Sequence, residues 1–162
     1  MTAPSPPAPS PDGRPWLLVV DPQRIFADPA SDWASPSFPA AMTQIQRLAA
    51  HVGPDRTLVT RWLPTADRST AWGDYFRAWP FADVPASDPL YELVDSAREL
   101  SAHPTVDEPT FGKWGPQLAA RIGATPGSRP HLQVAGVSTD CCVITTVLAA
   151  ADAGVRVTVV TD

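Results

Sequence analysis

The chain has 162 residues, a formal net charge of −5 and a pI near 5.0. This length corresponds to one domain with a substantial core, and the acidic balance disfavours nucleic acid and anionic membranes as partners. No stretch approaches the roughly 18 apolar residues of a membrane span.

Hydrophobic periodicity predicts one α/β domain after a short tail. Residues 1–15 hold six prolines and no apolar signal-peptide core, which predicts a disordered tail before a domain over 16–162. In chain order the predicted elements are a strand over 16–21, a Pro-rich loop over 22–37, a helix over 39–52, a strand over 57–62, an irregular aromatic-rich segment over 63–90, a short helix over 90–100, a weak strand over 106–111, a helix over 114–122, a strand over 132–137, a helix over 140–153 and a strand over 155–160.

This alternation predicts a three-layer α/β fold, with a mainly parallel sheet flanked by helices on both faces. An irregular segment as long as 63–90 inside a compact domain is typical of a lid, a binding loop or an interface.

The cysteines and histidines restrict the chemistry. The two cysteines are adjacent, at Cys141 and Cys142, so a disulfide scaffold is implausible and a reducing cytoplasm is the expected setting. His51, His103 and His131 lack the close spacing of a zinc site. We expect no metal and no other cofactor.

Three side chains of complementary chemistry follow predicted strands. Asp21 ends the first strand, Lys113 follows the third, and Cys142 follows the fourth. Loops at the carboxyl ends of parallel strands gather at one rim, so these residues are expected to converge. Asp21 could act as a general base, and Lys113 could stabilise a thiolate. A thiol at a helix N-terminus is also expected to favour the thiolate form.

Each residue also has a plain structural explanation. Asp21 could be a turn residue, Lys113 a solvated surface charge, and Cys142 a packing residue. Lys113 is the single lysine beside eleven arginines, which favours a specific role. The functional hypothesis depends on the joint placement of the three residues.

Three motifs resemble those of the isochorismatase-like cysteine hydrolases, a family with Rossmann-like topology. They are Leu17-Leu-Val-Val-Asp21-Pro-Gln, Phe111-Gly-Lys113 and Ala135-Gly-Val-Ser-Thr-Asp-Cys-Cys142-Val, and the similarity runs from about Pro15 to the C-terminus. The resemblance implies that Cys142 is the nucleophile, Cys141 a neighbour, and Asp21 and Lys113 its catalytic partners.

The resemblance also implies a cis peptide bond between Val137 and Ser138. The Ser138 and Cys142 amides would then form an oxyanion hole. Ser138 and Thr139 could equally serve as helix N-caps, and both roles can hold at once.

The chain also departs from the family's motifs. Leu63 and Asp67 stand where the nicotinamidase branch carries metal-binding histidines, so a metal-dependent nicotinamidase is disfavoured. The substrate residues of true isochorismatases are not recognisable after the second strand. The family usually continues with a helix beyond the position of Asp162, so the domain is expected to be short at its C-terminus, whether truncated or naturally short.

The substrate pocket is expected to be aromatic. Phe26, Trp62 and Trp114, with residues of 72–81, are candidate walls, although each could be core or interface packing. Arg61 could bind a substrate carboxylate or form an ordinary ion pair.

We therefore predict a metal-independent hydrolase that cleaves a small amide or related acyl substrate through a thioester on Cys142. One alternative is isochorismate-type vinyl-ether hydrolysis with Asp21 as the acid. Another is a non-catalytic binding protein with a relict site. The expected partners are a small-molecule substrate and, by resemblance, further copies of the chain in a dimer or tetramer.

Overall fold

The computed structural model describes residues 13–161, and its centre is a five-stranded parallel sheet. The strands are β1 (Trp16–Val20), β2 (Thr57–Trp62), β3 (Val106–Glu108), β4 (His131–Gly136) and β5 (Arg156–Val159). Their order across the sheet is β3-β2-β1-β4-β5, and every neighbouring pair is parallel. The predicted parallel α/β sheet is confirmed, and its order reverses between β1 and β4.

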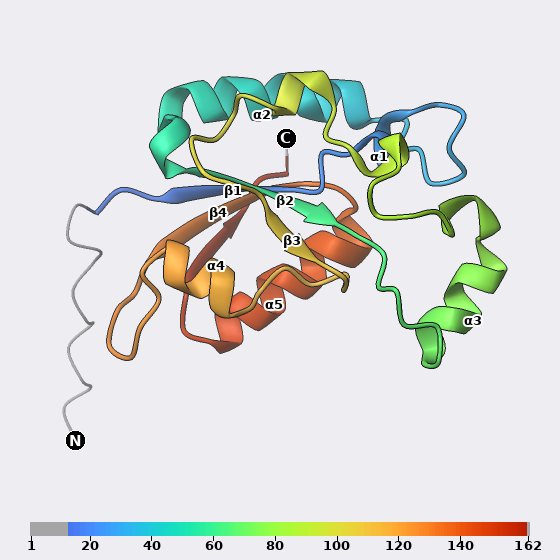
Figure 1. The fold of residues 1–162 in the computed structure, drawn as a ribbon. Coiled ribbons are helices and arrows are strands. Elements are labelled where there is room, and N and C mark those ends of the chain that lie inside the picture. The colour runs from blue at the N-terminus through green and yellow to red at the C-terminus, as the bar shows by residue number, and fades with distance from the viewer. Residues whose placement is uncertain (1–12, 162) are drawn as a thin grey trace.

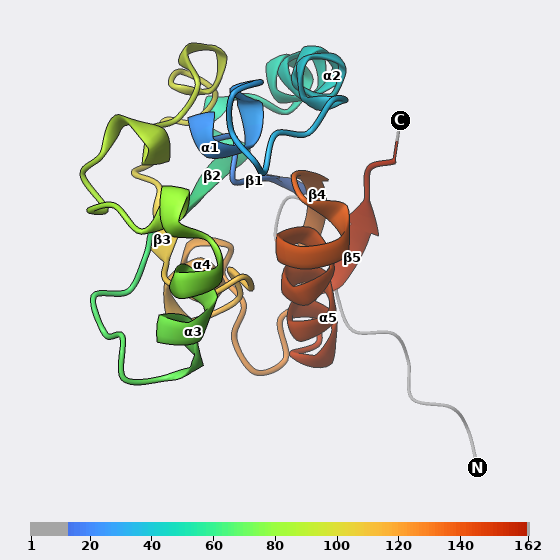
Figure 2. The ribbon, with the colours of Figure 1, turned by 90° about the vertical axis from the view of Figure 1, so that its right-hand side faces the viewer.

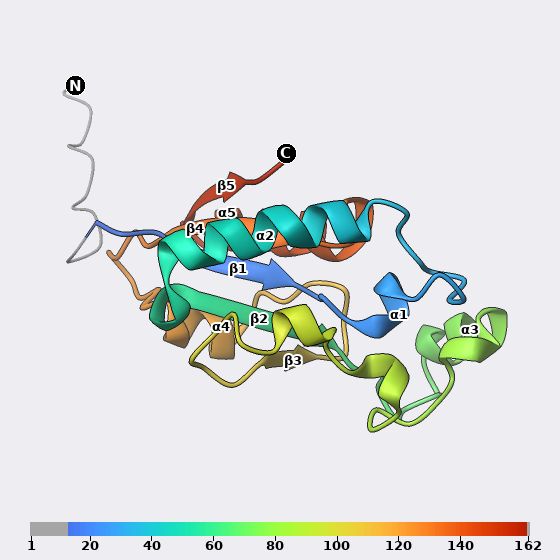
Figure 3. The same cartoon turned by 90° about the horizontal axis from the view of Figure 1, so that it is seen from above.

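Helices cover both faces of this sheet. Helix α2 (Phe38–Val52) lies on one face, and α4 (Pro116–Arg121) and α5 (Ile144–Asp152) lie on the other (Figure 1). The short helices α1 (Arg24–Ala27) and α3 (Ala71–Ala78) lie beyond the carboxyl ends of the strands (Figure 3). Seen along the sheet, α2 and α5 are separated by the strands, which gives three layers (Figure 2).

The central strand β1 is buried on both sides. Leu17 and Val19 belong to the core cluster shared with α2, while Leu18 and Val20 belong to the cluster shared with α4 and α5. Successive strand residues point to opposite faces. An uninterrupted apolar run is therefore what a central parallel strand requires.

The segment predicted as a helix over 90–100 is different in the structure. It forms two 3₁₀ turns, Pro89–Tyr91 and Asp95–Ala97, separated by extended residues. Leu93 bridges to Gln23, and the Val94 amide donates to Pro22 O at 2.9 Å. These long-range bonds use backbone groups that a continuous helix would need, so the helix prediction is wrong.

The structure also differs from the sequence prediction in the segments 63–90 and 106–111, for local reasons. The segment 63–90 contains α3, which begins where the Thr70 side chain accepts a hydrogen bond from the Trp72 amide. Strand β3 ends before Pro109, which has no amide hydrogen for a sheet ladder. The predicted tail over 1–15 lies largely outside the described residues.

Candidate active site

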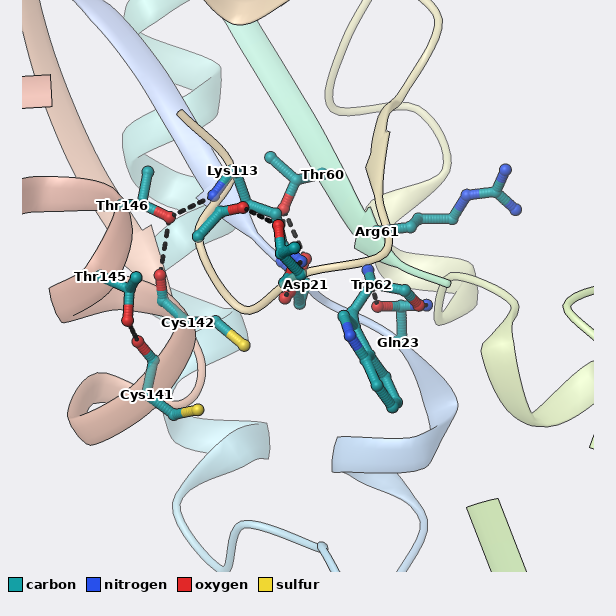
Figure 4. A network of polar contacts seen from close by, with 12 residues as sticks. Asp21, Gln23, Thr60, Arg61, Trp62, Lys113, Cys141, Cys142, Thr145 and Thr146 are labelled. Atoms are coloured by element: carbon teal, nitrogen blue, oxygen red, sulfur yellow. Dashed lines mark hydrogen bonds and ion pairs between the residues drawn. The ribbon is translucent and has the colours of Figure 1, made fainter. Parts of the chain in front are cut away.

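The candidate site lies at the carboxyl edge of the sheet, between β1 and β4. Asp21 directly follows β1, and a π-helical turn over Thr139–Val143 follows β4 and leads into α5. The strand order reverses between β1 and β4, and in open parallel sheets such a reversal leaves a crevice for ligands. The predicted convergence of Asp21, Lys113 and Cys142 at one rim is what the structure shows (Figure 4).

Asp21 and Lys113 form a buried ion pair. Lys113 Nζ lies 3.2 Å from Asp21 Oδ2, and both side chains are fully shielded from solvent. Lys113 Nζ also donates to the Thr110 carbonyl at 2.8 Å. A buried pair of this kind is weak support for stability, because removing both charges from water costs free energy. Its position beside a thiol points to chemistry instead.

The backbone around Asp21 is unusual. Asp21 has a φ of 48°, a left-handed conformation that aspartate tolerates better than most residues. Its Oδ1 accepts a hydrogen bond of 2.6 Å from Thr60. Oδ2 is buried and receives no well-directed hydrogen bond from the described residues, although the Lys113 ammonium lies close to it. Oδ2 is therefore the oxygen with free capacity to accept a proton.

The pKa of Asp21 is raised above its ordinary value, since burial disfavours the carboxylate more than its neighbours favour it. Lys113, Thr60 and Cys142 act in the opposite direction, through charge and hydrogen bonds. A raised carboxyl pKa makes Asp21 a stronger proton acceptor once it is ionised.

The pKa of the Cys142 thiol is raised far above its ordinary value, first by burial and next by the negative charge of Asp21. The resting cysteine is therefore a protonated thiol. The predicted preference for thiolate at a helix N-terminus is corrected here, because desolvation and the nearby carboxylate outweigh the favourable environment of the helix start. Cys142 consequently needs Asp21 to remove its proton.

A threonine connects the lysine and the cysteine. Thr146 in α5 is fully buried, and its hydroxyl accepts from the Lys113 amide at 2.9 Å and donates to Cys142 O at 2.7 Å (Figure 4). The side chain of Thr146 thus fixes the loop that carries Lys113 against the turn that carries Cys142. The role of this threonine was not predicted from the sequence.

The peptide bond between Val137 and Ser138 is cis, the bond that the family resemblance singled out. Gly136, the last residue of β4, has a φ of 126°, and a Cβ there would lie 2.2 Å from Val20 O. Only glycine permits β1 and β4 to approach this closely at their ends. The oxyanion-hole role of the Ser138 and Cys142 amides remains a prediction.

A cavity of about 220 Å³ opens beside Cys142. Its walls are mostly aromatic, and the described residues that line it are Phe26, Trp33, Trp62, Tyr75, Phe111, Ser138, Asp140, Cys141 and Cys142. Phe26 and Trp62, two of the predicted wall residues, line this cavity, and their contact with a substrate stays a prediction. Larger hollows lie between α2 and the β4–β5 edge and beside α4, and neither is lined by Cys142.

The wall residue Trp62 is positioned by Gln23. The Gln23 side chain accepts from the Trp62 amide at 2.8 Å and donates to the Trp62 carbonyl at 2.9 Å, and it also donates to Tyr91 O at 2.8 Å. Gln23 is fully buried, and buried backbone groups need hydrogen-bond partners. Its side-chain carboxamide supplies these partners to Trp62 and Tyr91 at the point where β1 has ended. This fixes the indole of Trp62 toward the cavity.

Two predicted substrate residues lie elsewhere. Arg61 forms a two-point ion pair with Asp107, at 2.9 and 2.6 Å, and points away from the cysteines (Figure 4). Trp114 packs against the core cluster of α4 and α5 and lines the hollow beside α4. Both assignments are corrected, since neither side chain lines the cavity at Cys142.

Trp33 and Tyr75 line the cavity but were not singled out from the sequence. Trp33 comes from the Pro-rich loop after α1, and Tyr75 comes from α3. Tyr75 lies within the aromatic-rich stretch 72–81, so its general region could be anticipated. Trp33 stands alone in a polar loop and gave no comparable signal.

The described residues do not form a metal site. In the segment that follows β2, Asp67 is exposed, and its Oδ1 accepts hydrogen bonds from the Ser69 amide and hydroxyl. Between residues 13 and 161, no three His, Cys, Asp or Glu side chains gather closely enough to hold an ion. No helix among these residues is long and apolar enough to cross a membrane.

The comparison with protein families identifies the class. The model of the isochorismatase domain matches residues 15–162, so the chain belongs to the isochorismatase family and is an isochorismatase-like hydrolase. No curated protein matches the sequence.

Solved structures share the fold. A cysteine hydrolase from Pseudomonas syringae pv. phaseolicola is 22% identical, with a TM-score of 0.75, over 99% of this chain and 76% of that one. N-carbamoylsarcosine amidase from Thermoplasma acidophilum is 18% identical, with a TM-score of 0.72, over 91% of this chain and 81% of that one. Pyrazinamidase from Pyrococcus horikoshii, solved with zinc, is 22% identical, with a TM-score of 0.64, over 90% of this chain and 83% of that one.

Proposed function

We propose that the protein is a metal-independent cysteine hydrolase that cleaves a small amide or related acyl compound through a thioester on Cys142. The observation that carries the proposal is the buried carboxylate of Asp21, which lies near enough to Cys142 to raise the pKa of its thiol, and whose Oδ2 has free acceptor capacity beside the Lys113 ammonium (Figure 4). The cavity at that thiol gives a small substrate access.

The chemistry follows from these positions. Asp21 Oδ2 takes the thiol proton as Cys142 Sγ attacks the substrate carbonyl, and the amides of Ser138 and Cys142 stabilise the oxyanion. Asp21 then returns the proton to the leaving amine as the C–N bond breaks. Asp21 then takes a proton from water as its oxygen attacks the thioester, and passes that proton to the departing Cys142 Sγ, which releases the acid and restores the thiol and the carboxylate. Lys113 offsets the carboxylate's charge throughout.

A labelling experiment tests the activation of the thiol. Iodoacetamide, followed by peptide mass spectrometry, should alkylate Cys142 before Cys141 in the wild type. Asp21→Asn should slow labelling of Cys142 at least tenfold and leave Cys141 unchanged. A relict site predicts slow labelling of Cys142 in both proteins, and that result would refute the proposal.

A turnover experiment tests the covalent step. A panel of small amides is screened for ammonia release, and Cys142→Ala should abolish release while Cys141→Ala retains it. Hydrolysis of a vinyl-ether substrate, assayed separately, that survives in Cys142→Ala but disappears in Asp21→Asn would instead favour vinyl-ether chemistry with Asp21 as the acid. That alternative is disfavoured because no Lys or Arg among the described residues lines the cavity to bind the carboxylates of an isochorismate-like substrate.

A further inference from the structure

The aromatic rings that line the cavity at Cys142 contact one another. Trp33 lies 5.6 Å from Trp62 and 5.6 Å from Tyr75, measured between ring centroids. The Phe111 ring contacts both Trp62 and Tyr75, with centroid distances of 6.5 Å and 5.7 Å. Phe26 stacks on Trp33 at 6.4 Å. The π faces of such rings carry partial negative charge, which attracts cations.

The charge at the edge of the cavity is negative, which also favours a cationic ligand. Asp140 is the charged side chain among the described lining residues, and it is exposed, at the start of the turn that carries Cys142. Burial, and then the nearby cysteines, raise the pKa of Tyr75 to about 12, so its phenol is neutral at physiological pH.

Two cations of the strands and loops around the site are paired with carboxylates. Lys113 Nζ is paired with Asp21 at 3.2 Å, and Arg61 is paired with Asp107 at 2.6 Å. A substrate carboxylate entering this cavity would lose its hydration without gaining a cationic partner, which is costly. A substrate cation would meet aromatic side chains and the Asp140 carboxylate.

We infer that the acyl substrate carries an organic cation, of the quaternary ammonium or substituted ammonium class, close to its carboxamide. The ammonium group lies against Trp33, Trp62 and Tyr75, and the carbonyl reaches Cys142 Sγ. This inference rests on the proposed function for the identity of the reacting bond. The recognition of the cation rests on the cavity alone, so the two can be tested separately.

Binding to the Cys142→Ala variant separates recognition from turnover. Isothermal titration calorimetry compares three amides: trimethylammonioacetamide, its uncharged isostere 3,3-dimethylbutanamide, and the anion succinamate. The cationic amide should bind roughly tenfold more tightly than the isostere, equivalent to about 1.4 kcal/mol, and succinamate should bind most weakly. Equal or tighter binding of the neutral isostere, or no binding of the cationic amide, would overturn the inference.

Matched variants identify the groups responsible. In the Cys142→Ala background, Asp140→Asn should weaken the cationic amide severalfold and leave the neutral one unchanged. Trp33→Leu should remove most of the preference, whereas Trp114→Leu, outside the cavity, should retain it. A preference that survives Trp33→Leu would contradict the assignment. Tetramethylammonium should bind to the wild type and quench its tryptophan fluorescence. If the protein binds the cation but hydrolyses no amide, the proposed function is refuted and the recognition of cations is not.

Discussion

The Thr60 hydroxyl contacts Asp21 twice: it donates a hydrogen bond of 2.6 Å to Asp21 Oδ1 and accepts one of 3.1 Å from the Asp21 amide. Thr60 is the fourth residue of β2, and its side chain is fully buried. One side chain thus holds both the carboxylate and the left-handed backbone of the proposed base.

Thr60→Val should reduce kcat/KM by about tenfold to a hundredfold at neutral pH. A hydrogen bond to a charged group contributes about 1.5–3 kcal/mol, which corresponds to this range. Loss of the bond also raises the pKa of Asp21 further, so the acidic limb of the pH–rate profile should move to higher pH. Thr60→Ser keeps the hydroxyl and should retain most of the activity. An unchanged profile in Thr60→Val would show that Thr60 does not position the base.

The raised pKa of Asp21 predicts how activity depends on pH. The reactive form has an ionised Asp21, and its fraction grows as pH increases through the folded-state pKa, which lies above the ordinary value of 3.8. The acidic limb of kcat/KM, measured on a neutral amide, should therefore lie above pH 3.8.

The raised pKa of Asp21 also predicts that stability decreases as pH rises, whereas activity increases. A carboxyl whose folded-state pKa is raised contributes stability below its unfolded pKa, and this contribution is lost as pH rises through the folded pKa. Urea unfolding of Asp21→Asn should lack this decrease. Identical pH dependence in the wild type and the variant would contradict the raised pKa.

Thr146 and Thr145 offer a matched pair in α5. Thr146 is buried and connects the Lys113 amide to Cys142 O, whereas Thr145 is exposed and donates only to Cys141 O at 2.6 Å. Thr146→Val leaves a buried amide without an acceptor and should cost about 1–3 kcal/mol of unfolding free energy. Thr145→Val should change it by less than about 0.5 kcal/mol. Chemical denaturation measures both, and equal effects would contradict the connecting role.

Arg61→Gln tests whether Arg61 binds substrate. Its side chain is committed to Asp107, so KM for the accepted amide should change less than twofold, whereas a substrate contact would raise KM severalfold. Burial raises the pKa of Asp107, but hydrogen bonds from Arg61 and Thr105 and the nearby positive charges lower it by more.

The stability of Arg61→Gln should fall by only about 0.5–1 kcal/mol at neutral pH, because both partners are partly exposed to solvent. A lowered carboxyl pKa gives stability above its unfolded value that is lost in acid. The difference between the wild type and Arg61→Gln should therefore vanish at low pH, and Asp107→Asn should reproduce it.

Gly136→Ala should destabilise the protein by roughly 2–4 kcal/mol, because the new Cβ meets Val20 O at 2.2 Å in a backbone of φ 126°. Gly154→Ala is the control, since Gly154 has a φ of 87° but nothing within 4 Å. It should cost only about 1 kcal/mol. Thermal unfolding of both variants separates the cost of close packing from the cost of backbone strain. Similar losses of stability in the two variants would show that close packing at Gly136 is unimportant.

The position of the site was partly predictable from the sequence. The apolar run Trp16–Val20 predicts a strand buried on both faces, and polar residues after such strands predict a common rim. Asp21, Lys113 and Cys142 could therefore be placed together from the sequence alone, because the polarity of a parallel sheet brings the ends of its strands together. The same logic could not identify which neighbouring side chains enter the cavity.

Tertiary structure decided the pocket. Arg61 and Trp62 are adjacent and project to opposite faces of β2, so their order in the chain could not assign one to an ion pair and the other to the cavity. Trp33 reaches the site from a loop without periodicity. The protonation of Cys142 depends on burial and on the distance to Asp21, two properties that exist only in the folded chain. The sequence determined the reacting groups through the direction of the strands, whereas side-chain packing across distant segments set their proton affinities and the chemistry of the cavity.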